Sequence, residues 1–549
     1  MSDRIDVKQA AEPAQAPLEV DGPDAVAWNE EVDIVIIGFG AAGASAAIET
    51  KERRLDALVI ERFNGGGATA ISGGVIYSGG GTRIQKEAGI EDGVEEMVRY
   101  LEMEIGDSVS PQTLRDFCET SVETFAWLEK HGLKFKASLC PKKTSYPLDR
   151  YCLYFSGNES FLPYREKAKP APRGHRVIGK GFAGPSFFAP LQKSVHGLGV
   201  PVHYQSRVTR LVRGRSGAIL GAEYRQIPGR WAKKHARFSR LAAALTVFSG
   251  KLAWKMRNKC VAIDAEYGET RYARARRGVV LSAGGFFYER DMVEEYAPKY
   301  RKGMPVGTIG DNGSGIRLGQ SVSGAVTKME KVSAWRFLNP PEAFAHGILV
   351  NRRGERYINE MRYGATTGHM MVEDNAGEGF LIMDQKIKRE AQKQLLPGRA
   401  KWFQSMPAFM NMFFFSKKGD TIEAAARAAK LDPEGVRKSV DAYNRIARGE
   451  ENDPFFKDAE YIDPIETPPF YVLDCSITSK GWPLPCLTLG GLEVDEKSGQ
   501  VKSDSGGTVE GLYAAGRTAV GICSNGYLSG LAIADCVYAG RRIARALAD

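Results

Sequence analysis

Two hydroxyl side chains near the C-terminus, Tyr527 and Ser529, stand close enough in sequence to pass a proton between them. They lie in the run Ser-Asn-Gly-Tyr-Leu-Ser-Gly-Leu of residues 524–531. An unperturbed phenol titrates near pH ~10, so a Tyr base at neutral pH needs hydrogen bonds that favour the phenolate, or a relay that carries the proton onward. Ser529 is suited to be that relay. The structural alternative is a Tyr and a Ser that satisfy backbone groups where a helix starts.

A third hydroxyl, Tyr363, follows residues 347–360, which predict a strand, a turn and a second strand. If the fold brings Tyr363 beside Tyr527, it can orient that phenol or donate a hydrogen bond to a substrate oxygen. A Tyr packed in the core is the alternative. Four more Tyr residues could line a pocket, although packing is the simpler role for each: Tyr100, Tyr146, Tyr151 and Tyr154.

The elements that must position these groups begin with a dinucleotide-binding turn. An apolar run over 32–37 predicts a strand, G-F-G-A-A-G follows it, and the Ala-rich stretch 44–50 predicts a helix. In this order Gly38 permits the turn, Gly40 lets the backbone approach a pyrophosphate, and Gly43 allows the helix to pack closely on the strand. The N-terminus of the helix then faces the phosphates.

Four more segments support a nucleotide site. Residues 58–60 predict a second strand that ends at Glu61, where such folds place the acid that binds the adenosine ribose. The Gly-rich run 65–74 is long for an ordinary connection, and loops of this kind tend to be functional. Two further strand-to-glycine segments follow at 278–285 and 511–517.

Length and composition indicate a globular protein of two domains. The 549 residues are 43% hydrophobic and 26% charged, close to the average for soluble proteins. Eight Cys without a C-x-x-C pair and seven His without metal spacing predict neither a metal site nor a disulfide framework. Residues 1–26 resemble no signal or transit peptide, so we expect a flexible tail and a cytoplasmic protein, with the inner membrane face as an alternative location.

One segment is strongly basic. Between Arg225 and Lys259 the chain carries ten Lys or Arg and no acid, interleaved with Trp, Phe and Leu. The segment is too interrupted by charge to span a bilayer, and it suits an amphipathic helix on an anionic membrane surface. A solvated helix pair is the alternative, and no nucleic-acid-binding fold accompanies the charge. A second apolar run, 406–415, reads as core unless it is exposed beside a pocket mouth.

Together the glycine-containing elements resemble the flavin-binding halves of the fumarate reductase and 3-ketosteroid dehydrogenase superfamily. The resemblance covers most of the chain and implies an α/β fold, in which a smaller α+β catalytic domain interrupts a Rossmann-like FAD-binding domain. It places the FAD-binding domain at 27–324 and 478–549, with the basic insert at 225–259, and the catalytic domain at 325–477. A helix over 530–547 then completes the flavin site.

The resemblance implies FAD as the cofactor and an external electron acceptor, because the sequence has no C-x-x-C-H haem site. The residues it implies for FAD binding are Gly38, Gly40, Ala42, Gly43, Glu61, Arg62, Gly67, Ala68, Thr69, Ser72, Gly73, Gly74, Val208, Ala283, Gly284, Gly285, Gly516 and Leu531.

Two motifs distinguish members of the superfamily. Fumarate reductases carry an Arg proton donor five positions after the Asn of the hairpin, where this sequence has Gly364, and the H-P-T motif is missing from 335–341. Arg362 could be a displaced Arg, which keeps a fumarate-reductase-like reaction as an alternative. A membrane-attached electron-transfer flavoprotein is another.

The C-terminal run favours a steroid. The 3-ketosteroid 1-dehydrogenases have Y-P-G-x-G, whose last Gly donates its N–H to the substrate ketone, and Leu531 stands in that place. The Y-L-S-G pattern is similar to the 3-ketosteroid Δ4-(5α)-dehydrogenases. This resemblance implies 4,5-dehydrogenation of a 5α-3-oxosteroid, with the proton lost α to the ketone, hydride passed to flavin N5, and Tyr527, Ser529 and Tyr363 as catalytic residues. A 3-ketosteroid 1-dehydrogenase is the alternative.

Overall fold

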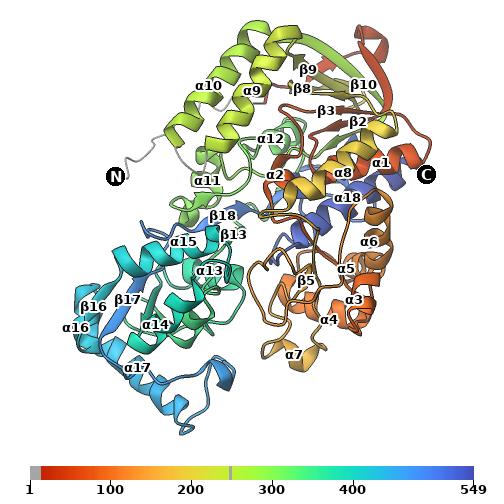
Figure 1. The fold of residues 1–549 in the computed structure, drawn as a ribbon. Coiled ribbons are helices and arrows are strands. Elements are labelled where there is room, and N and C mark those ends of the chain that lie inside the picture. Colours follow the sequence, from red (N-terminus) through yellow and green to blue (C-terminus); the bar gives the residue numbers. More distant parts are fainter. Residues whose placement is uncertain (1–13, 246–249) are drawn as a thin grey trace.

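The largest element of the protein is a nine-stranded sheet (Figure 1). The computed structural model describes residues 14–245 and 250–549. The sheet has the order β1-β8-β9-β10-β2-β3-β7, and β21, paired with β20, adds to β10. Its strands are β1 (Leu18–Val20), β2 (Glu30–Ile37), β3 (Ala57–Ile60), β7 (Val202–His203), β8 (Ser206–Gly214), β9 (Ile219–Gln226), β10 (Glu269–Leu281), β20 (Gln500–Lys502) and β21 (Thr508–Ala514).

The middle of this sheet is buried on both faces. Ile34 and Ile36 of β2 pack in the core that contains α1 (Ala41–Glu52) and α18 (Leu531–Ala548), while Val35 and Ile37 pack in a second core on the opposite face. Parallel strands with apolar residues at every position require cover on both sides. The expected α/β fold class is therefore present.

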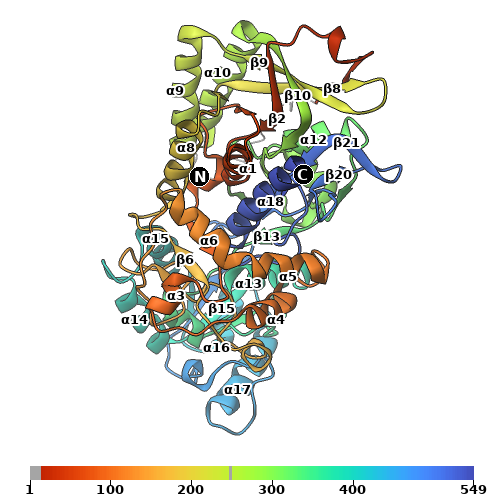
Figure 2. The same cartoon turned by 90° about the vertical axis from the view of Figure 1, so that its right-hand side faces the viewer.

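A smaller unit lies below the sheet in Figures 1 and 2 and has its own hydrophobic core. Its sheet has the order β14-β15-β17-β16. The strands are β14 (Ile348–Val350), β15 (Phe380–Met383), β16 (Lys417–Gly419) and β17 (Phe470–Asp474), and the helices are α13 (Gly364–Glu373), α14 (Gln385–Gln394), α15 (Trp402–Met410), α16 (Ile422–Ala428) and α17 (Pro433–Ala447). A linking sheet joins β18 (Pro485–Thr488) to β11 (Met304–Pro305) and β13 (Val332–Ala334).

The expected second strand after β14 does not form. Only an isolated bridge pairs Val350 with Arg356, and β14 pairs instead with β15. The cause is burial of Glu360, whose carboxylate accepts bonds from Arg356 and from Lys457 Nζ at 3.0 Å. These ion pairs hold the segment in turns.

Two other expectations also change. Residues 18–20, expected within a flexible tail over 1–26, pair with β8 as an edge strand, while residues 1–13 lie outside the described part of the chain. The basic segment 225–259 forms two packed helices, α9 (Gly229–Leu245) and α10 (Gly250–Tyr267), which corresponds to the helix-pair alternative rather than to one membrane-surface helix. This α9–α10 hairpin reaches beyond Lys259 and connects β9 to β10.

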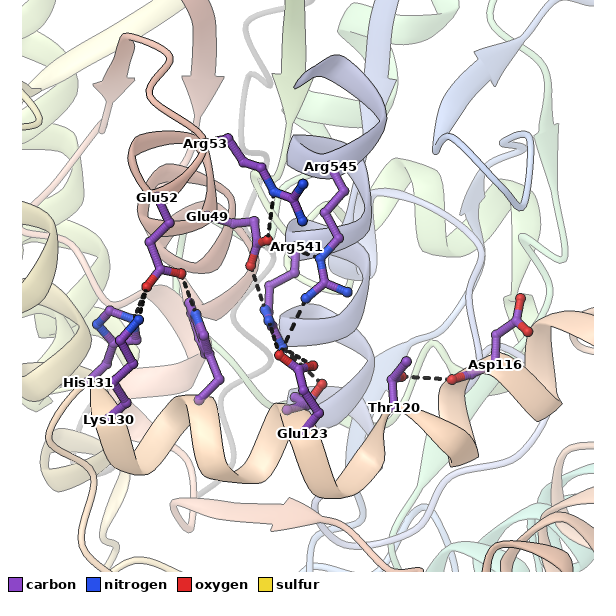
Figure 3. A network of polar contacts seen from close by, with 12 residues as sticks. Glu49, Glu52, Arg53, Asp116, Thr120, Glu123, Lys130, His131, Arg541 and Arg545 are labelled. Atoms are coloured by element: carbon purple, nitrogen blue, oxygen red, sulfur yellow. Dashed lines mark hydrogen bonds and ion pairs between the residues drawn. The ribbon is translucent and has the colours of Figure 1, made fainter. Parts of the chain in front are cut away.

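Buried ion pairs fasten the C-terminal helix to the nucleotide-binding half (Figure 3). Arg541 Nε of α18 donates to Glu49 of α1 at 2.8 Å, and Arg545 Nε donates to the same carboxylate at 3.0 Å. Arg541 also bonds to Glu123 of α6 (Ser121–Lys130) at 2.6 Å. Burial raises the pKa of Glu49, but the bonds from the two arginines outweigh it and the net pKa is lowered. Tyr527 and Ser529, which directly precede α18, are thereby fixed relative to α1.

Candidate active site

A cavity of about 900 Å³ opens where β2, β10 and β21 end side by side. The carboxyl ends of parallel strands are the usual place for a nucleotide in such folds. Twelve of the residues predicted to bind the cofactor line it: Gly38, Gly40, Ala42, Glu61, Arg62, Gly67, Ala68, Thr69, Val208, Ala283, Gly284 and Gly516.

The glycines of the first turn separate into two kinds. A Cβ on Gly38 would approach Ser282 O to 2.6 Å, and one on Gly43 would approach Gly38 O to 2.1 Å, so tight packing requires both glycines. A Cβ on Gly40 would meet no protein atom closer than 3.7 Å and would project where the turn borders the cavity. A pyrophosphate that needs this space accounts for Gly40, so the turn fits a dinucleotide.

Glu61 lies at the rim of the same cavity. Its carboxylate accepts the backbone N–H of Phe39 at 2.8 Å and of Phe63 at 2.7 Å, which locks the turn to the end of β3. Burial raises the pKa of Glu61 despite these bonds. The residue therefore stabilises the turn and also lines the cavity.

Six predicted cofactor residues do not line the cavity among the residues described. Gly43 packs α1 on the strand, and Ser72, Gly73 and Gly74 lie behind the wall, where a Cβ on Gly73 would strike the Tyr146 ring at 2.6 Å. The N–H of Gly285 bonds to Asp311 at 3.1 Å, and Leu531 is fully buried in the core. These residues shape the site from outside its surface.

The sequence interpretation missed an ion pair in the wall. Arg517 bonds to Asp311 at 2.5 Å, and both residues line the cavity next to Gly284 and Gly516. Arg517 is the last residue of the predicted strand-to-glycine segment 511–517, and Asp311 lies in the run G-T-I-G-D-N-G-S-G of residues 307–315. That glycine run was the available signal.

The three predicted catalytic residues come together. Tyr527 packs against Trp335 with ring centroids 5.2 Å apart, Trp335 contacts Phe337 at 6.2 Å, and Phe337 meets Tyr363 edge-on at 5.5 Å. The cluster is apolar apart from its hydroxyls, which suits a hydrophobic substrate.

Ser529 bonds to a residue that the sequence interpretation assigned to packing. Its hydroxyl shares a 2.8 Å hydrogen bond with the Tyr154 phenol, on β5 (Leu153–Tyr154). Burial raises the pKa of the Tyr363 phenol well above its ordinary range, and the Ser529 hydroxyl opposes this rise. Among the described side chains, the Tyr154 phenol is the one that hydrogen-bonds to the Ser529 hydroxyl. The 375 residues between Tyr154 and Ser529 left no local signal.

The Tyr527 phenol is electrostatically coupled to the cavity. Burial raises its pKa above the ordinary value, and the charge of Arg517 in the cavity wall opposes this rise. The charge of a residue in the cavity wall thus acts on the Tyr527 phenol.

Two arginines that could serve a fumarate-type reaction lie outside the cofactor cavity among the described residues. Arg362 donates to Tyr164 Oη at 3.1 Å and to Leu162 O at 3.2 Å. Arg336, fully buried, donates to Trp482 O at 2.8 Å. A dicarboxylate requires paired cationic donors, and neither arginine lines the cavity to supply one.

No group of three or more His, Cys, Asp or Glu side chains in the described ranges is arranged to hold a metal ion. Within 14–245 and 250–549, none of the helices is both long and apolar enough to cross a membrane.

Comparison with known proteins places this site in a family. A family model described as an FAD binding domain matches residues 33–530. A 3-oxo-5-alpha-steroid 4-dehydrogenase of Comamonas testosteroni is 38% identical over 517 residues, which cover 92% of this chain and 96% of that protein. A 3-oxosteroid 1-dehydrogenase of Mycolicibacterium smegmatis is 26% identical, covering 91% and 94%.

A solved structure is similar in both fold and sequence. It is a 3-ketosteroid-delta4-(5alpha)-dehydrogenase from Rhodococcus jostii RHA1 in complex with 4-androstene-3,17-dione, with a TM-score of 0.81 and 30% identity. The match covers 97% of this chain and all of that one.

Proposed function

Since the chain belongs to the FAD binding domain family and FAD is its cofactor, we propose that it dehydrogenates a 3-oxo-5α-steroid between C4 and C5. The relative that is 38% identical and the structure that is 30% identical bear the names of this activity. The observation that carries the proposal is a group of hydroxyl side chains, in which Tyr154 hydrogen-bonds to Ser529 and the Tyr363 phenol lies within electrostatic reach of Tyr154 and Tyr527.

Each hydroxyl side chain has a separate role in the proposed dehydrogenation. Bound FAD supplies a two-electron acceptor for the hydride that leaves C5. Tyr527 takes the C4 proton on its Oη, and the resulting electron pair forms the C4–C5 double bond as the hydride departs. Tyr363 donates a hydrogen bond that stabilises charge on the 3-oxo oxygen. Ser529 and its hydrogen-bonded partner Tyr154 would carry the proton onward once Tyr527 moves within reach of Ser529, since no hydrogen bond joins Tyr527 to Ser529 among the described side chains. An external acceptor removes the two electrons.

Anaerobic mixing tests whether this is an oxidising enzyme. The purified flavoprotein, mixed with the 5α-saturated counterpart of 4-androstene-3,17-dione, should lose its flavin absorbance in one stoichiometric step. Succinate under the same conditions should leave the spectrum unchanged. Bleaching by succinate, or none by the steroid, would contradict the proposal.

We also propose that the protein meets its substrate at an anionic membrane surface. The exposed residues Trp402, Met406, Phe409, Phe413 and Phe414, the aromatic patch, recur at helical spacing along α15 and the π-helical turn Asn411–Phe415. Exposed Lys417 and Lys418 follow. In Figures 1 and 2 α15 lies toward the same side as the basic α9–α10 hairpin. Apolar rings flanked by basic side chains suit a lipid interface.

A further inference from the structure

The α9–α10 hairpin forms part of the cofactor cavity, a position that its composition did not suggest. Its cavity-lining residues are Ser239, Arg240 and Ala243 of α9, and Trp254, Arg257, Asn258 and Val261 of α10. The same cavity includes Glu61 and Val208 at its adenosine end. We propose that α9 and α10, hereafter the lid, cover and bind the adenosine half of FAD. Arg257 is the cationic residue of the lid that contacts it.

The base of the lid is held firmly. The Trp231 ring, near the start of α9, stacks on the Tyr267 ring, at the end of α10, with ring centroids 3.8 Å apart. Asp264 of α10 accepts a 2.5 Å bond from Arg207 of β8, and Arg225 donates to the Asp264 carbonyl at 2.8 Å. The hairpin is therefore anchored to β8 and β9.

A second set of contacts ties the lid to the ribose-binding turn. The His235 ring stacks on Phe63 at 5.9 Å, and Asn64 Nδ2 donates to Ala236 O at 3.3 Å. Phe63 and Asn64 come directly after Glu61 and Arg62. The lid is thus positioned over the end of the cavity where the adenosine ribose is expected.

Arg257 has the features of a ligand contact. Its guanidinium lies over the Tyr288 ring at 4.9 Å, and its Nε is buried without a hydrogen-bond partner among the described residues. Burial and the nearby charge of Arg62 lower the pKa of Arg257 to about 10. The buried Arg257 Nε needs a hydrogen-bond acceptor, and the nearby Arg62 makes a negatively charged one favourable. The phosphates and ribose hydroxyls of FAD would supply such acceptor atoms.

The neighbours of Arg257 supply apolar surface for the base. Trp254 and Val261 line the cavity, and 36% and 42% of their surfaces are exposed to solvent. These are large exposed fractions for apolar side chains in a cavity wall. A bound adenine would cover apolar area of this kind. The lid therefore presents cationic and apolar groups suited to adenosine and phosphate.

Comparing FAD with FMN isolates the adenosine half. Apoprotein would be titrated with each flavin, and dissociation constants read from quenching of flavin fluorescence. Arg257→Met should weaken FAD binding about 10- to 100-fold, the loss of a charge-assisted contact, and leave FMN binding unchanged. The matched control is Arg237→Met, an exposed α9 arginine outside the cavity wall, which should alter neither constant.

A second measurement keeps the test valid if Arg257→Met folds poorly. Trypsin should cut the basic hairpin of wild-type apoprotein faster than that of FAD-loaded protein, and FMN should not restore the protection. Equal rates of trypsin cleavage with and without FAD would overturn the proposal that the hairpin is a lid. An FAD constant within twofold of wild type in a folded Arg257→Met variant, or equal losses for FAD and FMN, would overturn the role of Arg257.

Discussion

The raised pKa of the half-buried Tyr527 side chain opposes its proposed use as a base. Burial raises its pKa, and Arg517 only partly offsets this. The phenol is therefore protonated at neutral pH, and each unit of pH below its pKa reduces the reactive phenolate about tenfold. The proposed reaction gains from any group that removes this proton, which gives the Ser529 and Tyr154 hydroxyls their importance.

A pH profile tests this role for Tyr527. Because a raised pKa leaves the base protonated, log kcat/KM should rise with pH between 7 and 10, with a slope approaching one and no plateau. Tyr527→Phe should lower kcat by about 100- to 10,000-fold with little change in KM. Tyr151→Phe, in the packing cluster of Tyr154, is the control and should retain activity. A flat profile, or full activity in Tyr527→Phe, would exclude Tyr527 as the base.

The contact of α18 with α1 and α6 determines where the C-terminal hydroxyls lie. Arg541 and Glu49 side chains are 4% and 5% exposed, so removal of the cation leaves a buried carboxylate with fewer partners. Arg541→Met should lower the free energy of unfolding by about 3 kcal/mol in denaturant titrations. Arg53→Met, which removes a 40% exposed partner of the same carboxylate, should cost less than about 1 kcal/mol.

The same pair has a pH signature. The folded-state pKa of Glu49 is lowered, so its stabilisation is present above the unfolded-state pKa and is lost as pH falls through the folded-state value. The gap in unfolding free energy between wild type and Arg541→Met should therefore shrink in acid. A gap that widens as the pH falls would contradict this account of the contact.

Elements encoded by local spacing were predictable. The glycine turn, its two strands and α18 follow from residues close together in sequence, and they form nearly as expected. The second hairpin strand failed because Glu360 pairs with Lys457, 97 residues away. The lid was read as a surface helix because its charge pattern does not say what its inner face covers. Tyr154 was named as a possible pocket residue but assigned to packing, because its partner Ser529 lies 375 residues away in sequence.

At the scale of the whole molecule, the aromatic patch leaves a large apolar surface exposed to water, which binding to a partner would cover. Five large apolar side chains along one helical stripe exceed the scattered exposure normal for a monomer. Together with the exposed lysines it would orient the protein on a membrane that holds a lipophilic substrate.

Vesicle sedimentation measures this association. Wild-type protein should pellet with vesicles containing anionic phosphatidylglycerol, and less at high salt because the basic side chains contribute. The double variant Phe413→Ser/Phe414→Ser should lose most of this binding. Phe456→Ser, at a residue 53% exposed outside the patch, should bind like wild type. Equal binding by the double variant would remove the patch from the membrane proposal.

The regiochemistry of the product tests the central claim most directly. A 5α-3-oxosteroid with a saturated A ring would be incubated with the protein and an electron acceptor, and the product identified by mass spectrometry and NMR. The account predicts loss of two hydrogens, one each from C4 and C5, to give a 4-ene-3-one with a single vinylic proton at C4. A 1-ene formed from C1 and C2, or recovery of unchanged steroid from flavin-loaded protein, would contradict it.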